Sequence, residues 1–399
     1  MRRWVPIAEL KPGMTIVDLD LPWEASPFQR HELRLEDESQ VARLKAHGSQ
    51  RVAIEEDGAD GDSSEPPAPE AAVVGLPQNP DRPDAVPFEE EVGQARSVHL
   101  AAKAIVRGAM EDVRMGREVN TDAVMEIAGE MVDSLARNRM ALTSLTRLHS
   151  FDEYTFFHCV NVGVLTTAVG RRQGIVGDEL IRLGAGALLH DIGKVTIPLE
   201  ILNKPGKLTK DEYDVIKRHP EAGAEILHRT PGIAEDTIIP CLEHQERGDG
   251  TGYPYRKTLA AMSRSGLITQ VVDVYDALTT DRVYHKARTP YEVLRYLFGL
   301  GQSGQLDLTM VQQLILSTGI YPVGSLVELD TGERGIVYAV EQHEMLRPKV
   351  RLFFDGRGTL SPPFPVVDLS DDSTGPPRTI RAVLDAAAAG IDPAAYLDA

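Results

Sequence analysis

The sequence predicts a mainly α-helical protein, in which a helical core lies between two small β-rich segments. From residue 88 to residue 318, apolar residues recur at intervals of three and four, which is the period of a buried helix face. Residues 1–56 and 319–399 instead contain short alternating runs bounded by turn residues, a pattern typical of strands. Residues 57–87 are acidic and rich in Pro and Ala, and they contain too little apolar surface to offset the entropy of ordering. We therefore expect an N-terminal β-rich regulatory module, a mobile linker, a helical domain, and a C-terminal β module closed by a helix.

The composition excludes several classes of protein. The chain has 399 residues, 42% hydrophobic and 26% charged, as in an ordinary globular protein of two or three domains. It has no apolar run of about 18 residues and no apolar stretch near its start, so we expect neither a membrane span nor a secretory signal. Cys159 and Cys241 form no CxxC pair, which argues against a disulfide framework and a thiolate zinc site. We expect a cytoplasmic protein.

The charge balance limits the partners. With 42 basic and 60 acidic residues the net charge is −18, so we expect no DNA or RNA partner, because phosphate backbones are bound by basic faces. The excess of acidic residues is concentrated in residues 1–91, whereas residues 190–290 are almost balanced. An anionic small ligand therefore remains compatible with the middle of the chain.

Each segment contains its own element signals. In the N-terminal module we expect strands near residues 14–21, 31–35 and 51–54 and a short helix between them. This module either gates access to the site, docks a protein partner, or is a packing appendage.

In the helical segment, apolar spacing predicts one helix over residues 123–142. Thr209 and Glu212 form a capping box that opens a helix toward His219, and Pro220 suits the first turn of the next. Toward the C-terminus, strands near residues 325–329, 335–340 and 349–354 predict an antiparallel sheet, followed by a helix from Thr379 to Ala389.

Histidines and aspartates come singly from successive predicted helices, 25 to 32 residues apart. They are His158, the pair His190 and Asp191, His219, His244 and Asp273. Antiparallel helices of that length can bring such side chains into one cavity, where imidazole and carboxylate suit first-row metals. Taken alone, each histidine is more often a satisfied core residue. Asp273 is harder to dismiss, because an unpaired carboxylate in its apolar surroundings would carry a large desolvation cost.

Together these motifs resemble a known family. The run from His190 to Lys194, with His158 upstream and Asp273 downstream, resembles the HD-domain metal-dependent phosphohydrolases. The stretches 201–209, 244–254 and 273–278 are similar to those of the HD-GYP subfamily, with a resemblance over roughly residues 135–315. The N-terminal segment resembles a domain of unknown function that often precedes HD-GYP domains in bacteria.

The resemblance implies a function and a site. Members of the subfamily hydrolyse the bacterial second messenger cyclic di-GMP to pGpG, and often to GMP, by a metal-activated hydroxide. It implies two divalent metal ions, Fe or Mn, with Asp191 bridging them and Lys194 neutralising charge on the phosphate. By resemblance the first metal is held by His158, His190, Asp191 and Asp273, and the second by Asp191, His219 and His244.

The substrate contacts are expected in two places. Gly252, Tyr253 and Pro254 form a loop whose tyrosine could stack on guanine, although a purely structural turn is the alternative. Arg282 and Lys286 are candidate phosphate or guanine contacts.

The sequence departs from the subfamily at two positions. Gln245 stands where a second histidine is usual, so it ligates weakly or orients a water, and the affinity of the second site is in question. Tyr154 stands where members with three metals have a glutamate, so we expect no third ion. The remaining histidines outside the motif are assigned no role, and they are His31, His47, His99, His149, His228 and His343.

Two alternatives stay open. The domain could be a non-catalytic cyclic di-GMP receptor that signals to a partner, or an HD phosphohydrolase that acts on another nucleotide. Turnover of cyclic di-GMP would indicate an enzyme, whereas stoichiometric binding without turnover would indicate a receptor. The sequence sets neither the oligomeric state nor the input signal.

Overall fold

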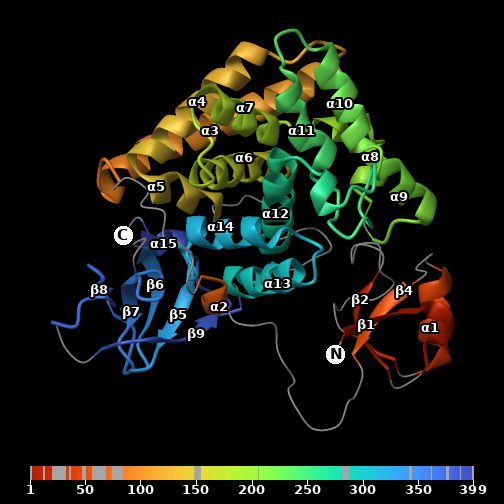
Figure 1. Ribbon diagram of the computed structural model, residues 1–399. Helices are drawn as coiled ribbons and strands as arrows, with labels where there is room; N and C mark the ends of the chain where they lie inside the picture. The colour runs from red at the N-terminus through yellow and green to blue at the C-terminus, as the bar shows by residue number, and fades with distance from the viewer. Residues whose placement is uncertain are drawn as a thin grey trace. The chain divides into compact units, whose positions relative to one another are not determined.

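The computed structural model describes most of the chain (Figure 1). The described ranges are residues 2–11, 14–19, 33–35, 37–46, 51–55, 69–73, 84–147, 154–204, 206–280, 287–340, 344–360, 362–373, 377–386 and 388–397. They form two compact units. The first unit comprises residues 1–65 and 194–219, and the second comprises residues 66–193 and 220–399.

The N-terminal part of the first unit is an antiparallel sheet in the order β1-β4-β2-β3. Its strands are β1 (Arg2–Pro6), β2 (Thr15–Leu19), β3 (Leu33–Arg34) and β4 (Arg51–Glu55), and α1 (Glu38–Ala46) precedes β4. Ile16, Leu44 and Ile54 are buried in its core. The last three strands and the helix agree with the sequence pattern. Strand β1 was not expected, because its basic residues and Pro6 hide the alternation.

The rest of the first unit contains helical turns from residues 194 to 219. They include α8 (Leu199–Leu202) and α9 (Lys210–Ile216). The predicted capping box is present: Thr209 Oγ1 accepts from the Glu212 N–H, and the Glu212 carboxylate accepts from the Thr209 N–H. The helix boundary expected from the sequence is therefore confirmed.

The second unit is built mainly of helices. They are α2 (Pro69–Val73), α3 (Phe88–Arg114), α4 (Thr121–Arg137), α5 (Arg139–Ser144), α6 (Tyr154–Arg172), α7 (Gly177–Leu188), α10 (His219–Arg229, its first residue excepted), α11 (Glu235–Glu243), α12 (Arg264–Thr279), α13 (Pro290–Gln302) and α14 (Leu308–Thr318). Helix α6 lies among α3, α7, α12 and α14, and residues 157–170 are buried throughout (Figure 1). A helix buried on all sides is the core element of such a domain.

Two details differ from the expected helices. The predicted helix over residues 123–142 is interrupted at Asn138, whose side chain accepts from the N–H groups of Met140 and Ala141 and so caps α5. Within the predicted linker, α2 forms, and its Ala72 is buried in the helical core. The Ala72 carbonyl accepts from Gln312 on α14, which adds a contact that composition could not show.

Small residues let α6 and α7 approach closely. A Cβ atom on Gly163 would lie 2.6 Å from Leu188, and one on Gly170 would lie 2.5 Å from Leu183. A larger residue at either position would have to push a leucine side chain of α7 aside. The contact matters for function because it brings His158, on α6, close to the residues that follow α7.

The C-terminal part is an antiparallel sheet in the order β8-β7-β6-β5-β9, as expected from the sequence. The strands are β5 (Leu326–Leu329), β6 (Arg334–Ala339), β7 (Lys349–Phe354), β8 (Val366–Asp368) and β9 (Ile380–Leu384). The predicted helix from Thr379 to Ala389 is wrong. Its first half forms β9, which pairs with β5 and sets Val383 opposite Val327. Pairing with an available strand outweighs weak local helix propensity, and a four-residue helix, α15 (Ala394–Leu397), follows instead.

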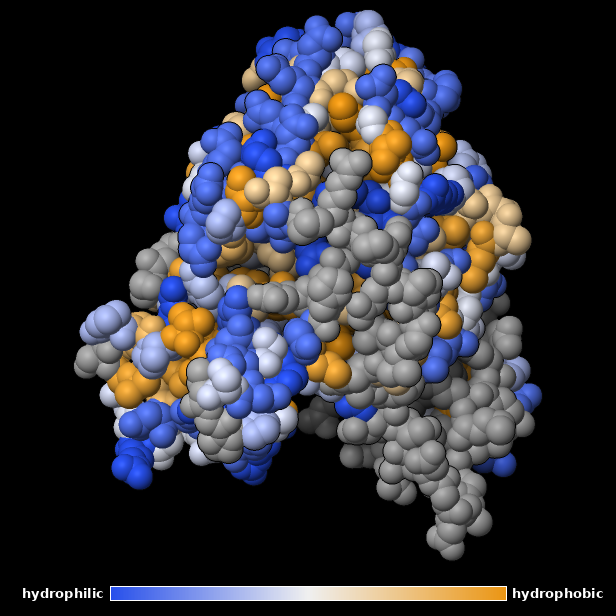
Figure 2. Space-filling model, turned by 60° about the vertical axis from the view of Figure 1, so that its left-hand side comes forward, coloured by the Kyte–Doolittle hydropathy of each residue, from blue (hydrophilic) through white to orange (hydrophobic). Residues whose placement is uncertain are grey.

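Large exposed hydrophobic side chains are few and scattered over the described residues. Examples are Leu100 on α3, Met115 at the C-terminal end of α3 and Val176 just before α7. Figure 2 shows a face on which hydrophilic residues alternate with small hydrophobic groups. Single exposed apolar residues of this kind are ordinary. Within the described part of the chain, no helix is both long and apolar enough to cross a membrane.

Candidate metal centre

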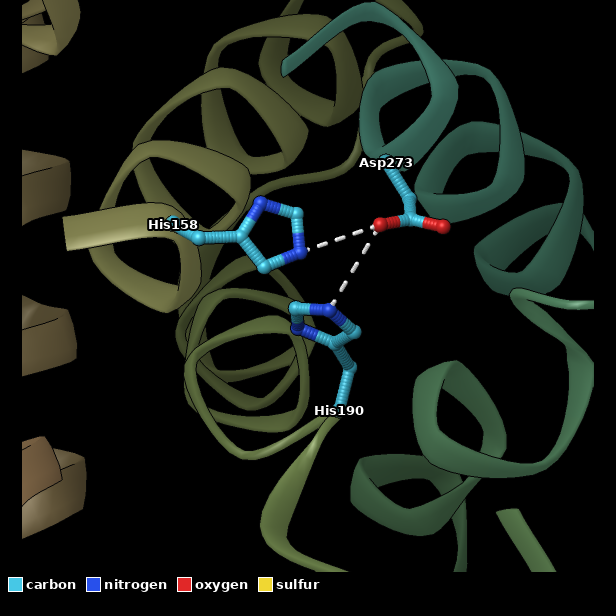
Figure 3. Close-up of side chains that lie close together, drawn as sticks. All are labelled: His158, His190 and Asp273. Atoms are coloured by element: carbon cyan, nitrogen blue, oxygen red, sulfur yellow. Dashed lines mark ion pairs between the residues drawn. The ribbon is translucent and has the colours of Figure 1, made fainter. Parts of the chain in front are cut away.

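Five of the predicted metal ligands lie together in the second unit. His158 is on α6, His190 and Asp191 follow α7, His244 ends α11, and Asp273 is on α12. They form two trios whose ligand atoms lie within 4.8 Å of one another: His158 with His190 and Asp273, and His190 with Asp191 and His244. All five are buried. Figure 3 shows the rings of His158 and His190 turned toward the Asp273 carboxylate.

The distances join the two trios through Asp191. In the first trio, Asp273 Oδ1 lies 3.1 Å from His158 Nε2 and 3.8 Å from His190 Nε2. One oxygen of Asp191, Oδ2, lies 3.4 Å from His190 Nε2 and 3.6 Å from His158 Nε2. The other oxygen, Oδ1, lies 3.6 Å from His244 Nε2. The two carboxylate oxygens thus face different sets of imidazoles.

Every predicted histidine ligand has its Nδ1 held by an acceptor. A carbonyl or carboxylate oxygen can only accept, so Nδ1 carries the proton and Nε2 is left to bind a metal. The acceptors are Asp276 Oδ2 for His158 (2.7 Å), the Ala187 carbonyl for His190 (2.8 Å), the Cys241 carbonyl for His244 (2.9 Å) and, within the first unit, the Ile216 carbonyl for His219 (2.8 Å). Exposed His228 has a similar bond to the Ala224 carbonyl, so this bond alone does not mark a ligand.

The donor set fits a divalent metal ion. Among the described residues, His190 Nε2 is buried without a hydrogen-bond partner, although a buried polar atom normally has one. An ion bound at about 2.1 Å separates adjacent ligand atoms by about 3.0–3.4 Å, which is close to the distances found here. Two buried carboxylates beside three imidazoles also supply the negative charge that a cation requires.

The charges of the cluster are coupled in the metal-free protein. Burial alone lowers the pKa of His158, but hydrogen bonds to Asp273 and Asp276 and their negative charges outweigh it and raise that pKa to about 9. Burial raises the pKa of Asp273, but the hydrogen bond to His158 and the charges of the neighbouring histidines hold it well below its usual range. Burial lowers the pKa of His190 and keeps its ring neutral.

Metal binding should therefore release a proton. Below pH 9 His158 is protonated in the metal-free protein, and a metal ligand must be neutral, so the apparent metal affinity should rise about tenfold per pH unit up to pH 9. Calorimetric titration with Mn²⁺ at pH 7, in two buffers of different ionisation enthalpy, measures the protons released. Asp276→Asn removes one source of the raised pKa and should reduce that number. Binding with no proton release at pH 7 would contradict this assignment.

Two residues that support His158 were not assigned a role from the sequence. Asp276 is 2% exposed and accepts from His158 Nδ1, and Asn161 donates to the other oxygen of Asp276 at 2.9 Å. Asp276 lies three residues after Asp273, hence on the same helix face, and that spacing was the available signal. Asn161 had no comparable signal. His99, also without an assigned role, is 3% exposed and lies beside Asn161.

Gln245 contacts a predicted ligand directly. Its amide Nε2 donates to Asp273 Oδ2 at 3.2 Å. In this arrangement the amide nitrogen faces the carboxylate and restrains its orientation. This hydrogen bond is the contact that the structure shows at the position where the subfamily usually has histidine.

The loop containing Gly252, Tyr253 and Pro254 folds back on the turn after α11. The Tyr253 N–H donates to the Gln245 carbonyl at 3.1 Å, and the Tyr253–Pro254 peptide bond is cis. A Cβ atom at Gly252 would lie 2.2 Å from the Arg247 nitrogen, so only glycine allows this approach. Tyr253 is half-buried.

The other predicted site residues lie either in the first unit or outside the described residues. Lys194 and His219 belong to the first unit, with Lys194 in a short 3₁₀ turn and His219 buried at the start of α10. Arg282 and Lys286 lie outside the described residues. Helix α6 begins at Tyr154, whose side chain is not among those described.

Histidines and aspartates that converge from successive helices, with an adjacent His–Asp pair among them, define an HD-type metal-dependent phosphohydrolase. Residues 131–310 match the family described as HD domain, and residues 3–124 match a domain of unknown function, DUF3391. The chain is 36% identical over 375 residues to cyclic di-GMP phosphodiesterase PA4108 of Pseudomonas aeruginosa, covering 92% of this chain and 89% of the relative. The chain therefore belongs to the same family of HD-domain proteins as PA4108.

Two further relatives match less than half of the chain. Cyclic di-GMP phosphodiesterase response regulator RpfG of Xanthomonas campestris is 36% identical over 172 residues, 43% of this chain and 45% of the relative. The 3′3′-cGAMP-specific phosphodiesterase 2 of Vibrio cholerae is 34% identical over 160 residues, 40% of this chain and 30% of the relative. Parts of this chain are thus similar to proteins named for two different cyclic dinucleotides.

Proposed function

We propose that this protein is a phosphodiesterase that hydrolyses cyclic di-GMP to pGpG, and onward to GMP, at a centre of two divalent metal ions. The observation that carries the proposal is Asp191, whose two oxygens face two different sets of histidine Nε2 atoms at 3.4–3.6 Å. A carboxylate so placed can bridge two ions. The name of PA4108, which is similar over 92% of this chain, supports the substrate.

The two ions are assigned to the two sides of Asp191. His158, His190, Asp191 and Asp273 hold the first ion, and Asp191, His219 and His244 hold the second. Imidazole and carboxylate ligands suit Fe²⁺ and Mn²⁺, which we propose as the native metals. Gln245 restrains Asp273 through its hydrogen bond and so supports the first ion more than it ligates the second.

The reaction needs a nucleophile and compensation for phosphate charge. A divalent metal, when bound, polarises phosphate oxygens and lowers the pKa of bound water to near neutrality. The residues of the chain position it: the Nδ1 bonds aim the imidazoles, and burial of Asp191 and Asp273 excludes competing water from the ligands. Lys194 neutralises charge that develops on the phosphate.

Substrate binding is assigned to groups around the centre. Tyr253 offers its ring to a guanine face, in a loop shaped by Gly252 and Pro254. Arg282 and Lys286 contact phosphate or guanine. Residues 1–56 act as a regulatory module joined through the linker 57–87 to the catalytic domain 88–318, and residues 319–399 form the C-terminal module.

The deciding experiment measures products and metal together. Protein purified without air and loaded with Mn²⁺ or Fe²⁺ is incubated with cyclic di-GMP or 3′3′-cGAMP, and the products are separated by chromatography. We expect two metal ions per chain and faster turnover of cyclic di-GMP. Faster turnover of 3′3′-cGAMP would reassign the substrate, and stoichiometric binding without turnover by metal-loaded protein would indicate a receptor. One ion per chain would contradict the second metal site.

A further inference from the structure

A series of buried, hydrogen-bonded side chains leads from the candidate metal centre to α3, a helix that lies outside the HD domain match. His99 is on α3 and only 3% exposed. It lies outside residues 131–310, which match the HD domain, and inside residues 3–124, which match the domain of unknown function. A polar side chain that is buried this deeply normally has a hydrogen-bond partner. The partners of His99 therefore indicate what this side chain does.

The partners of His99 form a continuous series. His99 Nε2 lies 3.3 Å from Asn161 Oδ1, and Asn161 Nδ2 donates to Asp276 Oδ1 at 2.9 Å. Asp276 Oδ2 accepts from His158 Nδ1 at 2.7 Å, and His158 Nε2 faces Asp273 at 3.1 Å. Each of these side chains is at most 6% exposed. The series therefore runs through protein interior from α3 to the candidate ligands.

The chemistry of the groups sets the direction of every bond. A carboxylate only accepts, so Asn161 must turn its amino group to Asp276 and its carbonyl oxygen to His99. That oxygen also only accepts, so His99 must donate from Nε2–H. The opposite orientation of Asn161 would set its oxygen against the Asp276 carboxylate. The Nε2–H group of His99 thus favours the orientation of the Asn161 amide in which its amino group donates to Asp276.

Aromatic packing restrains the His99 ring. Its centroid lies 6.0 Å from that of Phe157, with an interplanar angle of 28°. Lys103 Nζ lies over the Phe157 ring, 4.5 Å from its centroid. Phe157 directly precedes His158 on α6. His99 therefore packs against the same turn of α6 that carries His158.

We propose that His99 and Asn161 are positioning residues of the metal centre, which hold Asp276 so that it aims the His158 ring at the metal. The proposal rests on the metal site proposed above, but not on its substrate. Residues that orient ligands in this way typically contribute 10- to 100-fold to metal affinity. The N-terminal region defined by the family match thus contributes to the centre through α3.

Substitution of His99 separates positioning from packing. His99→Leu fills the space without a donor, whereas His99→Gln places an amide donor at a comparable reach. We expect His99→Leu to lower the Mn²⁺ affinity of the full chain by about 10- to 100-fold, and His99→Gln to bind nearly as tightly as the wild type. The readouts are competition with a chelating dye and the d–d absorption spectrum of the Co²⁺-loaded protein, which reports ligand geometry.

The outcomes distinguish this inference from the proposed function. Equal metal affinity and spectra for the wild type and His99→Leu would overturn it. So would equal losses in both variants accompanied by equal drops in thermal stability, because that result shows packing alone. If His99→Leu does not fold, His99→Gln decides: it must keep the wild-type affinity and spectrum. A wild type that binds metal without hydrolysing cyclic di-GMP would overturn the function and leave this test intact, whereas a wild type that binds no metal would overturn both.

Discussion

Asp191→Asn should abolish most of the metal binding and the turnover of cyclic di-GMP. The substitution keeps the shape of the side chain but removes the negative charge from a residue that is fully buried between His158, His190 and His244. An amide has one ligating oxygen in place of two, so it cannot bridge two ions as a carboxylate can. We expect kcat to fall by at least about 10²-fold and the metal content to fall below one ion per chain.

The measurement combines steady-state kinetics with metal analysis of the purified protein. Asp178→Asn is the matched control, because Asp178 is an exposed aspartate in the first turn of α7, the same helix that leads to Asp191. This control should change stability by no more than about 0.5 kcal/mol and leave turnover intact. A folded Asp191→Asn protein with two ions and normal kcat would refute the bridging role.

Glu246→Gln should have the next largest effect, because Glu246 holds the loop that follows the candidate ligands. Its carboxylate is fully buried and accepts from the N–H groups of Tyr255 at 2.7 Å and Lys257 at 2.9 Å. Glutamine can accept only one of these bonds, and its amino group would face the second N–H. A buried donor left unsatisfied costs about 1–3 kcal/mol. We expect lower thermal stability and a looser loop around Tyr253.

If that loop binds guanine, the KM for cyclic di-GMP should rise about tenfold for each 1.4 kcal/mol of binding free energy that the loosened loop loses. Thermal unfolding, KM and metal content should be measured on the same protein, and the metal bound by His158 and Asp273 should remain. Glu225→Gln, at an exposed position on α10, is the control and should change none of them. A destabilised Glu246→Gln protein with unchanged KM would mean that the loop only shapes the fold.

The chemistry of the centre was accessible from local sequence. The spacing of His158, His190, His244 and Asp273 predicts ligands on successive helices, and these residues do meet. The capping box at Thr209 likewise predicts a helix start, because both partners lie within four residues. Such signals need only residues that are near in sequence or share one helix face.

Other features depend on contacts between distant parts of the chain. Helix propensity alone favours a helix where β9 forms, but β5 offers a partner that only the folded chain supplies. His99 and Asn161 are 62 residues apart, and Asn161 and Asp276 are 115 apart, so nothing local marks the series that orients His158. Sequence pattern therefore determined the helical class and the choice of candidate ligands. Tertiary packing decided which ring nitrogen of each candidate histidine ligand is left to bind a metal, because buried hydrogen bonds form only when separate helices pack together.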